Sequence, residues 1–164
     1  MNPLIVLGIQ CSFSMFISFL LMNWYVLPKI STTTKFDILA ILLIVNVFRY
    51  LPLSLFMPGQ VSNEFPEYLK EIVAHGDFLS GSLALVALLL LKAKHKWAIG
   101  SIWLFSIVSI IDIIIVLVLA MKEKVYEIPL GANYFTVSVY VPLLIVIQVV
   151  IIKIISKKRD EQYA

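Results

Sequence analysis

The sequence is poor in the residues that crosslink small domains and in those that keep proteins soluble. It has a single cysteine, Cys11, and only 14% of its 164 residues are charged. One cysteine excludes an internal disulfide and the exchange chemistry of a cysteine pair, so we interpret Cys11 as a small apolar side chain within a helix. The shortage of charge excludes the solvated surface of an ordinary globular protein.

Apolar residues take the place of the missing charges. They make up 61% of the sequence, and the mean hydropathy is +0.99. This composition is typical of an integral membrane protein, in which backbone polar groups within the bilayer must be bonded internally. The apolar stretches are continuous and do not alternate with polar residues as barrel strands do. We therefore predict an all-α membrane helical bundle that forms a single domain over residues 1–164.

Five stretches are long enough to cross a bilayer as helices, since a core about 30 Å thick needs about 20 apolar residues. The predicted transmembrane helices are residues 3–27, 38–57, 73–91, 97–121 and 134–155. A cleaved signal peptide is the alternative for the first segment. We favour a membrane span there, because no basic residue precedes the apolar run and the run continues past any plausible cleavage site.

Basic residues between the spans predict the orientation of the chain. They concentrate in alternate segments, which the positive-inside rule assigns to the cytoplasm. These residues are Lys29, Lys35, Lys92, Lys94, Lys96, Lys153, Lys157, Lys158 and Arg159. We expect an external N-terminus and a cytoplasmic C-terminus in a cell membrane, specifically a bacterial cytoplasmic membrane. This distribution also explains the pI near 9.0, so we predict no binding of nucleic acid.

Charged residues inside the predicted spans are the candidates for a functional site. In the outer half of the spans lie Arg49, His75, Asp77 and Asp112. A lone charge at the centre of a span costs about 2.5 to 3.5 kcal/mol on insertion scales, so we expect these residues to pair within the bundle. Asn46 and Ser109 lie three residues before Arg49 and Asp112, so each adds a polar neighbour on the same helix face.

The charges of this predicted cluster do not balance. Arg49 supplies one positive charge against the two negative charges of Asp77 and Asp112. Either one carboxylate is protonated, or His75 is protonated beside it, or a cation or cationic ligand supplies the missing charge. Such a site can respond to protons, and it can equally be a static clamp that holds the fold.

Two prolines within the spans predict local breaks. Pro52 and Pro142 have no N–H to donate to the carbonyls of Phe48 and Ser138, so each should kink its helix. Transporters open backbone groups toward a binding cavity in this way. Simple kinks are the alternative, because prolines are common in membrane helices.

The third predicted span has a face of small residues. Gly76, Ser80 and Ala84 recur every four residues, as do Asp77 and Gly81. Such a face lets neighbouring helices approach closely. We therefore expect Asp77 to point into the bundle.

Other chemistries have weaker support in the sequence. His75 and Asp77 alone give a weak metal signal, and the other histidine, His95, falls in a predicted loop, so a haem with two histidine ligands is excluded. The sequence has neither a nucleophile-elbow motif nor a glycine-rich phosphate loop. An enzyme is therefore the less favoured class, and the sequence identifies no cofactor or metal.

Several motifs occur in a recognisable order: "FRYLPLSLFMPG", "AHGDFLSGSLALVALLLLK", "WLFSIVSIIDIIIVLVLA" and "VPLLIVIQVVIIKII". In this order the chain resembles small uncharacterised bacterial multi-pass membrane proteins. The resemblance implies that the matching positions are Arg49, Gly76, Asp77, Trp103, Asp112 and Pro142. Such proteins often carry a histidine where this chain has Gln148. The resemblance implies no particular activity.

Three functions are consistent with these features. The first, which we favour, is binding or transport of a small ion, a proton or a lipid-like ligand in the outer half of the bundle. The second is an accessory or structural subunit in which the charges form a closed clamp, with a membrane-protein partner or a second copy bound elsewhere. The third is a membrane enzyme that acts on lipid through His75 and Asp77.

Overall fold

The computed structural model describes residues 1–28 and 35–160, with side chains described up to residue 156. The chain forms five long helical segments and contains no strand within these residues. The prediction of an all-α chain with five helices long and apolar enough to cross a membrane is confirmed. Lys29 and the side chains of Lys157, Lys158 and Arg159 lie outside the described part.

The helices and their bounds are as follows. The first segment is α1 (Pro3–Leu21), which continues as the π-helix η1 (Met22–Val26). The second is α2 (Lys35–Val47), which continues as the 3₁₀-helix η3 (Phe48–Phe56). The third and fourth are α3 (Glu67–Lys92) and α4 (Ala98–Lys122). After the short η4 (Val125–Glu127), the last segment comprises α5 (Asn133–Phe135), the π-helix η5 (Thr136–Tyr140) and α6 (Val141–Asp160).

Local sequence signals explain where several helices begin and end. The side chain of Asn2 accepts a hydrogen bond from the Leu4 N–H at 2.9 Å, and a proline fills the first helical position. α3 begins directly after Pro66, six residues before the predicted span. Hydropathy marks where a helix becomes apolar, whereas proline marks where it starts. Lys94 and Lys124, both with φ of 51°, end α3 and α4 in left-handed turns.

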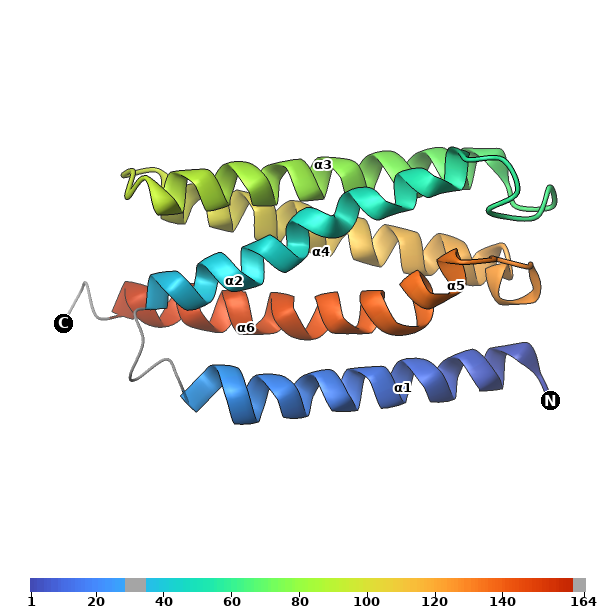
Figure 1. Cartoon of the computed structure of the whole chain (residues 1–164), viewed down its shortest axis with the longest axis horizontal. Helices are drawn as coiled ribbons and strands as arrows, with labels where there is room; N and C mark the ends of the chain where they lie inside the picture. The colour runs from blue at the N-terminus through green and yellow to red at the C-terminus, as the bar shows by residue number, and fades with distance from the viewer. Residues whose placement is uncertain (29–34, 161–164) are drawn as a thin grey trace.

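The helices run along the long axis of the molecule, and the start of α1 and the end of α6 lie at opposite ends of it (Figure 1). In this view α3 and α4 lie on one side, α1 and α6 lie on the other, and α2 crosses obliquely between them. The turn between α3 and α4 lies at the same end as the end of α6. The loops that follow η3 and α4 lie at the opposite end.

The segment formed by α2 and η3 is the most enclosed of the five. Half of the residues in its most apolar stretch are buried, against 6% in the segment formed by α1 and η1. The main apolar core is contributed by α2, α3, α4 and α6, with Leu43, Ala87, Phe105 and Ile151 among its fully buried members. Of the small-residue face predicted for this helix, Ser80, Gly81 and Ala84 are buried, and Gly76 and Asp77 are partly buried. α1 therefore packs at the edge of a bundle formed by the other four segments.

Candidate functional site

Arg49 is buried because of the way the second segment changes its helix type. Pro52 cannot donate to the Phe48 carbonyl, and from Phe48 onward the chain forms a 3₁₀-helix. With three residues per turn, positions three apart share a face, and Arg49, Pro52 and Leu55 are the buried residues of η3. The side chain of Arg49 is only 1% exposed.

The guanidinium of Arg49 joins three helical segments. Its Nε donates to Oδ1 of Asp77 on α3 at 2.7 Å, and Nη2 lies 2.7 Å from the same oxygen. Nη1 donates to Oγ of Ser109 on α4 at 2.5 Å, and Nη2 also donates to Oδ2 of Asp112. Charge-assisted bonds of this kind are among the strongest hydrogen bonds in proteins. We call Arg49, Asp77, Ser109 and Asp112 the charged cluster.

Two glycines of α3 make room for the charged cluster. A Cβ added at Gly76 would collide with Oδ1 of Asp112. A Cβ added at Gly81 would lie 3.0 Å from the Val47 carbonyl oxygen and 3.5 Å from Cβ of Arg49. The small-residue face of α3 therefore does two things: it brings η3 close, and it leaves space for the carboxylate of α4.

Gln148, which was not predicted as a site residue, extends the cluster to α6. Its Oε1 accepts a hydrogen bond from Oγ of Ser109 at 3.4 Å, and its side chain is buried. Its Nε2 is buried without a hydrogen-bond partner among the described residues. A single amide within an otherwise apolar span was the available signal.

Within the described residues, two of the predicted site residues make no hydrogen bond to the guanidinium. His75 is exposed, with Nδ1 2.9 Å from the Glu71 carbonyl oxygen and its ring packed on Phe56 at a centroid distance of 5.7 Å. Asn46 is buried, but its amide donates to the Leu42 carbonyl of its own helix at 2.8 Å. The charged cluster is therefore built without these two side chains.

Pro142 lies at the second position of α6, directly after the π-helix η5. Pro52 thus lies within a 3₁₀-helix and Pro142 lies just after a π-helix, so each is close to a departure from regular α-helix. The hydroxyl of Tyr140, the last residue of η5, donates at 2.7 Å to the carbonyl of Val45, just before η3 begins. This bond ties the last segment to the second one close to the charged cluster.

A cavity of about 340 Å³ lies against the charged cluster. Arg49, Asp77 and Asp112 form its charged wall. The rest of the lining is almost entirely apolar and comes from α1, α4, the loop after α4, and the last segment. From α1 it includes Leu4, Leu7, Cys11 and Met15, from α4 Ile113, Val116, Leu117 and Ala120, and from the last segment Val137, Val141, Pro142 and Leu144.

The charged cluster carries unequal charges. One guanidinium faces two carboxylates, whose side chains are 15% exposed for Asp77 and 10% for Asp112. Within the described residues, no group of three histidine, cysteine, aspartate or glutamate side chains is placed to hold a metal ion. The two carboxylates lie beside an apolar cavity. They can accept hydrogen bonds or pair with a positively charged group.

Comparison with known proteins identifies the family of the chain. Residues 6–156 match the family described as Domain of unknown function (DUF8737). No curated protein and no solved structure matches the chain.

Proposed function

Because the chain belongs to the DUF8737 family, whose description names no activity, we propose a function from the site alone. The protein is an integral membrane protein with five spans that binds a lipid-like ligand in the cavity beside the charged cluster. The single observation that carries this proposal is that Arg49, Asp77 and Asp112 line an otherwise apolar cavity.

The outer surface supports placement in a membrane. Large apolar side chains on the outside of the bundle are more than half exposed, among them Phe13, Trp24, Leu89, Ile114 and Val118. A soluble monomer rarely exposes contiguous apolar surface on this scale. The lysine distribution supports an external N-terminus and a cytoplasmic C-terminus in a bacterial cytoplasmic membrane.

The cavity suits an amphipathic molecule. Ligand sites usually measure about 300 to 1,000 Å³, are mostly apolar, and contain a few polar groups that fix orientation. The volume of about 340 Å³ and the charged wall fit this description. The apolar body of the ligand would lie along α1, α4 and α6, with its head group at Asp77 and Asp112.

The charge of the cluster indicates the chemistry of the head group. Within the described residues, the hydrogen bonds of Arg49 use one oxygen of each carboxylate, Oδ1 of Asp77 and Oδ2 of Asp112. The second oxygens can accept from a head group that donates hydrogen bonds or carries positive charge. A proton or a small cation is the smallest occupant that restores neutrality.

The bonding of Arg49 supports a second candidate, an accessory or structural subunit. All three guanidinium nitrogens are hydrogen-bonded within the bundle. A buried network of this kind can serve only to fix how helices pack. Function would then reside in a surface that contacts another membrane protein or a second copy.

Native mass spectrometry of the gently purified protein distinguishes the two candidates. Asp112→Asn removes one negative charge but keeps an oxygen that can accept from Arg49. Under the ligand proposal, the wild type carries a bound small molecule or lipid that this variant loses, while Asp37→Asn, at the other end of the bundle, retains it. Protein partners without a bound ligand in any of the three proteins would overturn the ligand proposal in favour of the accessory subunit.

A further inference from the structure

A second hollow lies at the end of the bundle that holds the turn between α3 and α4. Its volume is about 710 Å³, and it lies between the start of α2, the end of α3 and the start of α4. Basic side chains form its rim: Lys92, Lys94, His95 and Lys96. Phe36 and Leu91 contribute apolar surface to the same hollow. It shares no lining residue with the cavity beside the charged cluster.

Backbone hydrogen bonds fix the turn that carries these basic residues. The N–H of Lys94 donates to the Leu91 carbonyl at 3.1 Å, and that of His95 donates to the Leu90 carbonyl at 3.0 Å. The N–H of Trp97 donates to Nδ1 of His95 at 3.2 Å. The lysines therefore extend from a tight, internally bonded turn, which reduces the backbone entropy lost when an anion binds.

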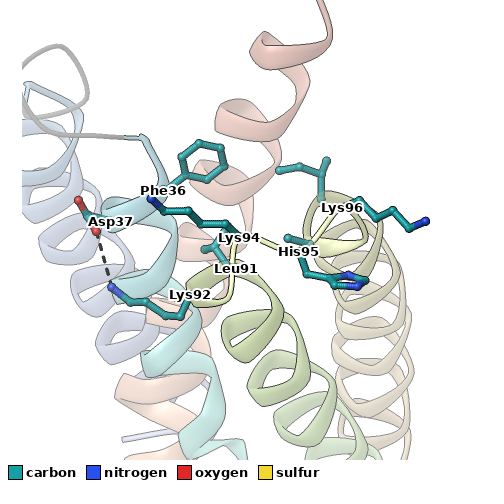
Figure 2. A pocket seen from close by; sticks show the side chains of 9 residues that line it. Phe36, Asp37, Leu91, Lys92, Lys94, His95 and Lys96 are labelled. Atoms are coloured by element: carbon teal, nitrogen blue, oxygen red, sulfur yellow. Dashed lines mark ion pairs between the residues drawn. The ribbon is translucent and has the colours of Figure 1, made fainter.

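Lysines outnumber acidic side chains among the described residues that line this hollow. Lys92 lies 3.6 Å from Oδ1 of Asp37, and both side chains are more than half exposed. Figure 2 shows Lys92 and Lys94 extending to the same side, toward the start of α2, whereas Lys96 points away on the side of α4. Among the described residues that line the hollow, two lysines thus extend toward one aspartate, which gives this part of the lining an excess of positive charge.

We propose that this hollow binds a phosphate group, with Lys92 and Lys94 as the side chains that attract it. An anionic phospholipid is the source that the surroundings favour, because apolar surface from Phe36 and Leu91 lies beside the basic rim. The exposed Trp97, at 64%, lies in the same turn, and tryptophan favours the head-group level of a bilayer. Lysines near a membrane surface attract anionic lipids.

The chain supplies a closely matched control. Lys92 is the last residue of α3 and is followed by Lys94 with φ of 51°. Lys122 is the last residue of α4 and is followed by Lys124 with the same φ. The double variant Lys92→Gln with Lys94→Asn can thus be compared with Lys122→Gln with Lys124→Asn. Asparagine tolerates the left-handed conformation, so both variants preserve the turn.

The experiment is a titration of the detergent-solubilised full chain with phosphatidylglycerol and, separately, with phosphatidylcholine of the same acyl chains, followed by native mass spectrometry. We expect the wild type to bind phosphatidylglycerol about tenfold more tightly than phosphatidylcholine. The Lys92 and Lys94 variant should lose this preference, and the Lys122 and Lys124 variant should keep it. Melting curves check that each variant is folded.

A parallel titration with inorganic phosphate distinguishes an anionic phospholipid from a soluble phosphate compound as the source of the bound phosphate group. Stabilisation of the wild type by phosphate, lost in the Lys92 and Lys94 variant, would support the site and assign it to a soluble phosphate compound. Equal loss of phosphatidylglycerol preference in both double variants would overturn the proposal, because attraction would then follow total charge. The same conclusion holds if neither phosphatidylglycerol nor phosphate binding depends on Lys92 and Lys94.

Discussion

A permanently charged side chain in an apolar helix is stable only if its surroundings replace the water it has lost. Arg49 is 1% exposed, and its nitrogens are bonded to Asp77, Ser109 and Asp112. The planar, forked guanidinium can reach several acceptors on different helices at once, whereas a lysine would present a compact point charge. At the scale of the residue, the charged cluster is organised by the shape of arginine.

Removing Arg49 should therefore be costly. We expect Arg49→Ala to lower the free energy of unfolding by about 3 to 5 kcal/mol, because it leaves two carboxylates buried without their cation. Thermal or denaturant unfolding in detergent measures the loss. Lys92→Ala is the control, since it removes one partner of an exposed ion pair and should cost no more than about 1 kcal/mol.

A compensated variant separates the loss of charge pairing from the loss of arginine's packing. Asp77→Asn and Asp112→Asn, added to Arg49→Ala, remove the unpaired charges and should restore part of the lost stability. A triple variant less stable than Arg49→Ala alone would contradict the assignment of the loss to unpaired carboxylates.

The residues of the charged cluster differ in how far the sequence could predict their positions. The cost of a lone charge in a membrane was enough to predict that Arg49, Asp77 and Asp112 should pair. The expected shared face of Asn46 and Arg49 is consistent with the burial of both side chains, but the amide of Asn46 donates to the Leu42 carbonyl of its own helix and not to the cluster. Gln148 reaches the cluster through its hydrogen bond with Ser109, a long-range contact that no local pattern encodes.

Among the helices, α3 packs closely against its neighbours at two glycines, Gly76 and Gly81. Its Gly81 faces the point where α2 becomes η3, and a Cβ there would lie 3.0 Å from the Val47 carbonyl oxygen. The sequence could predict a small-residue face from the four-residue spacing, because that spacing is a property of one helix. It could not predict which neighbour this face would meet, since that depends on how all five segments pack.

Replacement of Gly81 by alanine should therefore loosen the contact between α3 and η3. We expect Gly81→Ala to lower the free energy of unfolding by about 1 to 3 kcal/mol, because the added methyl meets backbone atoms that cannot easily move. Gly100→Ala is the matched control on α4, where a Cβ has nothing within 4 Å. That variant should be unchanged or gain up to about 1 kcal/mol from helix propensity. Equal losses for the two variants would contradict the close-approach role of Gly81.

For the whole molecule, the proposed orientation can be tested with single cysteines. In a Cys11→Ser background, Glu64→Cys places a thiol in the loop between η3 and α3, and Lys96→Cys places one in the turn between α3 and α4. A membrane-impermeant maleimide should label Glu64→Cys on intact bacterial cells, and Lys96→Cys only after permeabilisation. The reverse pattern would show that the lysine-rich end faces outward.

The proposed function requires that the cavity lined by Arg49, Asp77 and Asp112 holds a ligand. Val116 lines this cavity, whereas Val118, two residues along the same helix, is 62% exposed on the outer surface. Val116→Trp should fill part of the cavity without altering any charge, and Val118→Trp adds the same ring to the outside. This pair keeps Arg49, Asp77 and Asp112 intact.

The most direct measurement is native mass spectrometry of the wild type and these two variants, purified side by side. We predict that the wild type and Val118→Trp carry the same bound small molecule or lipid and that Val116→Trp has lost it while remaining folded. If the molecule is retained by Val116→Trp, or if none is bound to the wild type, the cavity does not hold a ligand. The charged cluster would then serve to pack the helices.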